Sequence, residues 1–271
     1  MELVPYAIQE QVVKTVVRSG NGGAVWVPKS WLGEEVIVIL PKRPERDVRE
    51  KILHMLKPYL QDITAVAIFG SYARKEQTKN SDIDVLVVVK DNPLPFTKKE
   101  NIEIISLSLP ALQRAMEKRP EVYYQMVKEA EPVFNAPVFE ELKKLPFTGT
   151  GVKRFFRETK EHLMSSKRLI EVDQELGMHL TSYSALYSIL LRLRNLFIIR
   201  CTAREEDFSM QRFKHWLGEQ GISRREIEDA LTVFHSIRDG RRVKNLSVSI
   251  TAAEKFLSLL TKELTAEESR V

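Results

Sequence analysis

The chain has 271 residues, 43% hydrophobic and 29% charged, so it is long enough for two or three domains with buried cores. Its net charge of +5 favours an anionic partner without requiring one. A single cysteine excludes an intrachain disulfide, and no run approaches the roughly 20 apolar residues that span a bilayer. The start also lacks the basic and apolar regions of a signal peptide, so we expect a cytoplasmic protein without a membrane partner.

Residues 1–45 predict a small β-domain. Apolar runs on both sides of the glycine-rich segment 19–23 predict two strands joined by a turn, followed by a short helix and a final strand up to residue 40. The strand, Gly-Asn-Gly turn, strand ending in Val-Pro-Lys and final Val-Ile-Val strand resemble the AbrB/SpoVT family. This resemblance implies paired hairpins that bind DNA, and the basic residues of the matching kind are Lys14, Arg18 and Lys29.

The same segment is expected to need a partner. About thirty residues bury too little apolar surface to be stable alone, so pairing with a second copy or docking on a neighbouring domain is expected. We favour a homodimer. Acidic residues offset the basic ones across residues 1–45, so a purely structural dimerisation module is the alternative to a DNA-binding one.

Residues 46–147 predict a domain that combines strands and helices. Apolar residues at helical spacing between positions 47 and 60 predict an amphipathic helix. Two β-branched apolar runs, residues 66–69 and 85–89, predict buried strands, and residues 102–107 predict a third. Helices at 109–118 and 122–128 and a short strand at 132–134 are expected to follow.

Two short motifs lie beside the first two strands. Gly70 and Ser71 can turn the backbone so that amide groups and a hydroxyl point at phosphate oxygens. Asp82 and Asp84 are two positions apart, so both project from one face of a strand, where their oxygens suit Mg²⁺ or Mn²⁺. At this spacing the motifs resemble the signature of the DNA polymerase β-like nucleotidyltransferase superfamily, in particular its minimal and kanamycin nucleotidyltransferase-like members.

This resemblance implies further site residues. Relatives carry a third carboxylate on a later strand, and Glu103 is the acid inside the predicted strand 102–107. Glu103 would complete the metal site and help to deprotonate the acceptor, with a solvent-facing strand residue as the alternative. Arg74 and Lys75 follow the Gly-Ser turn, where a cation could reach a β- or γ-phosphate; solvated surface charge is the alternative for both.

Residues 148–271 predict a helical bundle. A boundary with proline, phenylalanine and glycine at 146–151 precedes helices at 152–176, 180–200, 209–220, 224–238 and 251–264. Ser223 with Glu226 and Thr251 with Glu254 have capping-box spacing. The order of core and bundle resembles kanamycin nucleotidyltransferase-like enzymes and minimal nucleotidyltransferases fused to a HEPN-like bundle. A basic turn is expected between the last two helices, at Arg238, Arg241, Arg242 and Lys244.

The predicted fold class is therefore α+β, with a small N-terminal β-domain, a mixed-sheet nucleotidyltransferase core and a C-terminal helical bundle. The resemblance implies a Mg²⁺-dependent enzyme that transfers NMP from an NTP, ATP being favoured, to an acceptor hydroxyl and releases pyrophosphate. The alternatives are a DNA-binding regulator or antitoxin-like protein with an AbrB-like module, and a scaffold without activity. The sequence identifies neither the acceptor nor the base of the NTP.

Overall fold

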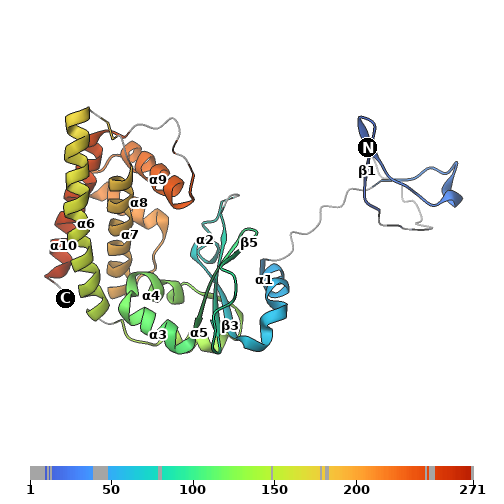
Figure 1. The fold of residues 1–271 in the computed structure, drawn as a ribbon, viewed down its shortest axis with the longest axis horizontal. Coiled ribbons are helices and arrows are strands. Elements are labelled where there is room, and N and C mark those ends of the chain that lie inside the picture. Colours follow the sequence, from blue (N-terminus) through green and yellow to red (C-terminus); the bar gives the residue numbers. More distant parts are fainter. Residues whose placement is uncertain are drawn as a thin grey trace. The chain divides into compact units, whose positions relative to one another are not determined.

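The computed structural model describes residues 10, 12, 14–38, 48–78, 81–147, 149–177, 179–180, 183–241, 243 and 248–269. The chain divides into two compact units, residues 1–47 and 48–271, and each is considered by itself. Figure 1 shows a small unit that contains a hairpin and a larger unit that contains a sheet and many helices. The division predicted between residues 147 and 148 stays a prediction.

The N-terminal unit contains the predicted hairpin. Strand β1 (Val17–Ser19) pairs antiparallel with β2 (Gly22–Ala24), with Ser19 opposite Gly22 across the turn. Gly20 has a φ of 57°, the left-handed conformation that glycine adopts readily. The short helix η1 (Lys29–Trp31) follows. The predicted final strand differs: residues 34–38 are not in a strand, and residues 39 and 40 lie outside the described residues.

The larger unit is built on a five-stranded mixed sheet with strand order β5-β6-β4-β3-β7. The strands predicted from apolar runs are confirmed, and each is longer than or as long as its run. The central strand β4 pairs antiparallel with β3 and parallel with β6, while β7 joins the outer side of β3 and β5 the outer side of β6. The strands are β3 (Ile63–Phe69), β4 (Ile83–Val89), β5 (Lys98–Lys99), β6 (Ile102–Ser108) and β7 (Glu131–Phe134).

Both faces of the sheet are covered, which explains why its central strands β3 and β4 are apolar at every position except Thr64 and Asp84. Ile83, Val85 and Val87 of β4 share one buried cluster with Ile52 and Leu56 of the first helix. Leu86 and Val88 of β4 belong to a second cluster on the other face, which contains residues of the helices after β6. These helices are α1 (Val48–Leu56), continued by η2 (Lys57–Asp62), on one face, and α3 (Leu109–Lys118), α4 (Pro120–Lys128) and α5 (Ala136–Lys143) on the other.

The C-terminal part of this unit is helical, as predicted, and has its own apolar core. Its helices are α6 (Gly149–Leu176), α7 (Ser184–Ala203), α8 (Met210–Glu219), α9 (Arg224–Arg238) and α10 (Ile250–Glu268). The long helices α6, α7 and α10 lie side by side (Figure 1), and Leu186, Leu193 and Phe256 are completely buried among them. None of the helices in the described ranges combines the length and apolar character needed to cross a membrane.

Of the two predicted capping boxes, the first is confirmed and the second is wrong. Ser223 and Glu226 form the complete reciprocal pair, and α9 begins at Arg224 as predicted. The second prediction is wrong: the cap of α10 is Ser249, whose hydroxyl accepts the N–H of Ala252. The helix therefore begins before Thr251, because Ser249 supplies the cap two residues earlier.

Candidate functional site

The predicted acids lie at one edge of the sheet. Strands β4 and β6 are parallel, so both begin at this edge, and their register places Asp84 opposite Glu103. On the other side of β4, Asp84 is opposite Phe69, the last residue of β3. Asp82 directly precedes β4. The structure thus brings the Asp82–Asp84 motif, Glu103 and the end of β3, where Gly70 follows, to the same edge.

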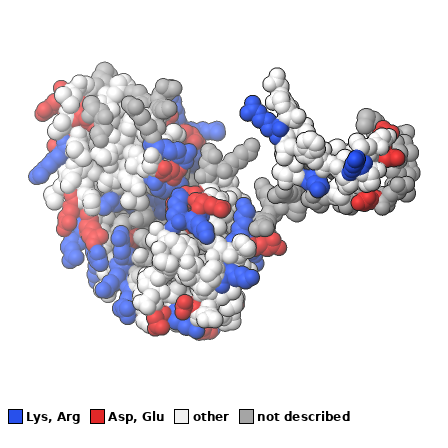
Figure 2. All heavy atoms as spheres, turned by 45° about the vertical axis from the view of Figure 1, so that its right-hand side comes forward, with Lys and Arg blue, Asp and Glu red and all other residues white. Residues whose placement is uncertain are grey.

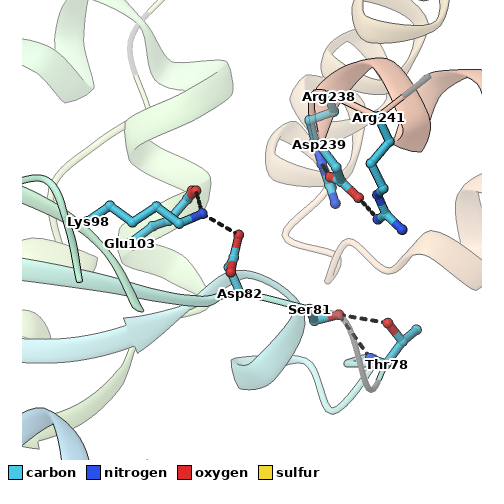
Figure 3. A network of polar contacts seen from close by, with 8 residues as sticks. All are labelled: Thr78, Ser81, Asp82, Lys98, Glu103, Arg238, Asp239 and Arg241. Atoms are coloured by element: carbon cyan, nitrogen blue, oxygen red, sulfur yellow. Dashed lines mark hydrogen bonds and ion pairs between the residues drawn. The ribbon is translucent and has the colours of Figure 1, made fainter. Parts of the chain in front are cut away.

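A lysine lies between two of these carboxylates (Figure 3). The Lys98 Nζ atom is 2.8 Å from Asp82 Oδ2 and 2.8 Å from Glu103 Oε1. The antiparallel pairing of β5 with β6 places Lys98 opposite Glu103, which accounts for its position. These hydrogen bonds raise the pKa of Lys98 above its ordinary value. Asp82 and Glu103 therefore direct oxygens at one shared positive charge.

Asp84 differs from Asp82 because it is more enclosed. Burial raises the pKa of Asp84 to about 6, and the negative charge of Glu103 acts in the same direction. The positive charge of Arg238 opposes this increase. An additional cation at this edge would favour the ionised carboxylate for the same reason.

The donor chemistry of this edge fits a hard divalent cation. Asp82 and Glu103 already face a common cation, and the charges of Asp84 and Glu103 interact. Carboxylate oxygens are the ligands that Mg²⁺ and Mn²⁺ prefer. Among the described ranges, however, no group of three His, Cys, Asp or Glu side chains is already arranged to hold a metal ion. The metal set Asp82, Asp84 and Glu103 therefore stays a prediction.

The Gly-Ser turn packs directly against Asp84. Gly70 has a φ of 73°, and a Cβ atom at this position would lie 3.1 Å from Asp84 Cγ and overlap Oδ2. Only glycine avoids both problems, which explains its place at the end of β3. Ser71 follows, half-buried, in the single-turn helix α2 (Gly70–Ala73).

Glu129 holds this turn from the end of α4. Its Oε1 atom accepts the N–H of Gly70 at 2.8 Å, and its Oε2 atom accepts from Arg74 at 2.7 Å and from Gln125 at 2.9 Å. Glu129 is 59 residues from Gly70 in the sequence. No local pattern marks it, so sequence reasoning missed this residue.

The two cations predicted to assist phosphate binding have different surroundings. Arg74 is only 14% exposed and also donates to Glu76 at 2.8 Å, so it belongs to an internal ion-pair network. Lys75 is exposed and has a φ of 57°. The phosphate contact stays a prediction for both residues. The exposed Lys75 side chain is less enclosed than that of Arg74.

The end of helix α9 in the helical bundle lies across from the edge of the sheet that carries these acids. Figure 3 shows Arg238, Asp239 and Arg241, at the end of α9, across from Asp82 and Lys98. Asp239 forms ion pairs with both arginines. Positive and negative side chains are interspersed on the face drawn in Figure 2. Arg242 and Lys244 of the predicted basic turn lie outside the described residues.

The predicted DNA-binding residues all belong to the N-terminal unit and are exposed. Arg18 lies on β1 opposite Gly23, and Lys29 begins η1. Lys14 precedes the hairpin. Their contact with DNA stays a prediction.

Residues 50–141 match the family model "Polymerase beta, Nucleotidyltransferase". "Putative protein adenylyltransferase MJ1379" of Methanocaldococcus jannaschii is 42% identical over 59 residues, which are 21% of this chain and 58% of that protein. "Putative protein adenylyltransferase MJ0128" of the same organism is 46% identical over 48 residues, 18% of this chain and 48% of that protein. The chain thus spans about half the length of these relatives.

Similar solved structures were also found. The spectinomycin adenyltransferase AAD(9) from Enterococcus faecialis, with ATP and spectinomycin, has a TM-score of 0.42 and 17% identity, over 80% of this chain and 97% of that one. A nucleotidyltransferase-like protein from Exiguobacterium sibiricum 255-15 has a TM-score of 0.36 and 12% identity, over 83% and 76%.

Proposed function

We propose that this chain transfers the NMP group of an NTP to an acceptor hydroxyl and releases pyrophosphate, because residues 50–141 match the polymerase β nucleotidyltransferase family model. The observation that carries the proposal is the meeting of the Gly70 turn, Asp84 and Glu103 at one edge of the sheet. ATP is the proposed donor, since the relatives are named as adenylyltransferases.

Asp82, Asp84 and Glu103 would hold the metal, Mg²⁺ or Mn²⁺. When bound, the ion would supply positive charge that stabilises the charge developing on the phosphoryl oxygens. The half-exposed Glu103 would accept the proton of the acceptor hydroxyl.

The chain itself would orient the donor. The Gly70 N–H already donates to Glu129, so the Ser71 hydroxyl would hold the polyphosphate at the turn that Gly70 makes, with Lys75 able to approach it from the exposed side. Glu129 fixes the Gly70 amide and Arg74 before any substrate arrives. A turn that is already in place costs less ordering free energy when the nucleotide binds.

An Asp82→Asn variant tests this proposal, with Asp91→Asn as the matched control. Asp91 is exposed at the other end of β4 and is not part of the site. With labelled ATP and Mg²⁺, pyrophosphate release should fall by about 100-fold or more in Asp82→Asn and stay at the wild-type rate in Asp91→Asn. Equal rates in the two variants, with equal melting temperatures, would refute the assignment.

The acceptor is open to a direct assay. Because relatives are named as protein adenylyltransferases, we propose a protein hydroxyl as the first acceptor to examine. The purified chain incubated with α-labelled ATP should transfer label to protein, and Asp82→Asn should not. α-Label recovered only in a small molecule would exclude a protein acceptor.

We also propose that the N-terminal unit pairs with a second copy. Trp26, Leu32 and Val38 are each more than 70% exposed in this unit, which is a large apolar surface for so few residues. A homodimer in light scattering that becomes monomeric in Leu32→Ser would support the pairing. A monomeric wild-type protein at all concentrations would contradict it. DNA contact would appear as a gel shift that weakens steeply with salt.

A further inference from the structure

The side chain that joins Asp82 and Glu103 has no role in the function proposed so far. Lys98 contacts one oxygen of each carboxylate at 2.8 Å. Each of the three side chains is between 40% and 50% exposed. The ammonium group is therefore held by charge rather than by burial, and a long flexible side chain in this setting can exchange partners.

Backbone pairing between β5 and β6 accounts for this contact. Strand β5 is only two residues long, and its pairing with β6 places Lys98 opposite Glu103 and Lys99 opposite Ile102. Successive residues of a strand point to opposite faces. Lys98 therefore shares a face with Glu103 and Asp84, whereas Lys99 does not.

We propose that Lys98 is the internal counter-ion of the metal site, occupying Asp82 and Glu103 until a divalent cation arrives together with a polyphosphate. This inference rests on the proposed function. The ammonium group and a divalent cation cannot share the same oxygens, because each needs them at contact distance and the two cations repel each other. A free divalent cation must therefore displace Lys98 without offering it a new anionic partner.

A metal–nucleotide complex changes this balance. Its phosphate oxygens are acceptors for an ammonium group that leaves the carboxylates. Lys98 would then weaken binding of the free ion and strengthen binding of the ion with a triphosphate. The affinity for the metal would therefore be higher with the nucleotide bound than without it, and the ratio of the two affinities measures this positive coupling.

The experiment measures Mn²⁺ binding by the electron paramagnetic resonance signal of the free ion. Wild type, Lys98→Met and Lys99→Met are titrated alone and with a nonhydrolysable ATP analogue. Lys98→Met should bind Mn²⁺ alone about tenfold more tightly than wild type, since two exposed ion pairs no longer compete. Lys99→Met, which removes the neighbouring charge on the other face, should resemble wild type. In the presence of the analogue, Lys98→Met should lose most of its advantage.

Two further variants make the readout specific. Lys98→Arg keeps the positive charge and should bind Mn²⁺ alone as wild type does. Adding Asp82→Asn to Lys98→Met should abolish the gained affinity, which locates the ion at this edge. Equal Mn²⁺ affinity of wild type, Lys98→Met and Lys99→Met would overturn the counter-ion role. Binding of Mn²⁺ but no analogue by any of the proteins would instead overturn the proposed function and the coupling that rests on it.

Discussion

Gly70→Ala is the substitution whose effect can be worked out most fully from the structure. Two penalties are expected. The first is conformational, because alanine at a φ of 73° costs roughly 1 to 2 kcal/mol. The second is steric, because the added Cβ would lie 3.1 Å from Asp84 Cγ and overlap its Oδ2 atom. Such overlap in a packed site costs typically about 1 to 3 kcal/mol and is relieved by moving Asp84.

Gly221→Ala is the matched control for the conformational penalty. Gly221 has a φ of 83° in the connection between α8 and α9, and an added Cβ would have no atom within 4 Å. Its substitution should cost only the first penalty, roughly 1 to 2 kcal/mol. The difference between the two variants isolates the steric effect on Asp84.

The assay combines urea unfolding with pyrophosphate release from ATP. Both variants should be less stable than wild type, and Gly70→Ala should be the less stable of the two. Catalysis should fall by about 100-fold or more in Gly70→Ala, since a displacement of about 1 Å in a reacting group has this effect, and should persist in Gly221→Ala. A Gly70→Ala protein as active as Gly221→Ala would refute the reasoning that Asp84 needs this turn.

Three further substitutions test other parts of the larger unit. Glu129→Gln should raise the KM for ATP and lower the unfolding free energy by about 2 kcal/mol, because Gly70 and Arg74 lose a charged acceptor; an unchanged KM in steady-state kinetics would exclude a positioning role. Phe208→Ala should lower the free energy of unfolding in urea by about 3 to 5 kcal/mol, since the buried ring contacts Arg74 and Arg194. A decrease of less than about 1 kcal/mol would contradict this packing. Hydrogen bonds from Lys255 and Ser223 lower the pKa of Glu226 to about 2, below its ordinary value of 4.5. The stabilising effect of this carboxylate is therefore present above pH 4.5 and is lost as the pH falls toward 2. Glu226→Gln should therefore flatten the pH dependence of urea unfolding in that window, and a slope equal to that of wild type would contradict the assignment.

Local signals made much of the fold predictable. Runs rich in apolar and β-branched residues identified β3, β4 and β6, because strands covered on both faces carry few polar residues. Capping chemistry located the start of α9 at Arg224. Elements with weak local signals were missed, among them the two-residue β5, which exists through its pairing with β6, and α5, whose first residues include Pro137.

The same distinction applies to the site. Gly70, Ser71, Asp82 and Asp84 were recognisable because each motif is contiguous, and Glu103 followed from its strand. Lys98 and Glu129 were not, because pairing at a sheet edge and the packing of α4 bring them to the motif. A lysine and a glutamate in ordinary surroundings have no signature in one sequence.

Phe208 is buried in the segment between α7 and α8. The guanidinium carbon atoms of Arg74 and Arg194 lie 5.4 Å and 4.9 Å from the centre of its ring. Beside it, Glu76 accepts the N–H of Met210 at 2.8 Å, and Lys128 donates to the carbonyl of Glu206 at 2.7 Å. These contacts join the segment between α7 and α8 to α4 and to the residues that follow α2, so a movement of this segment away from them would break all three contacts together.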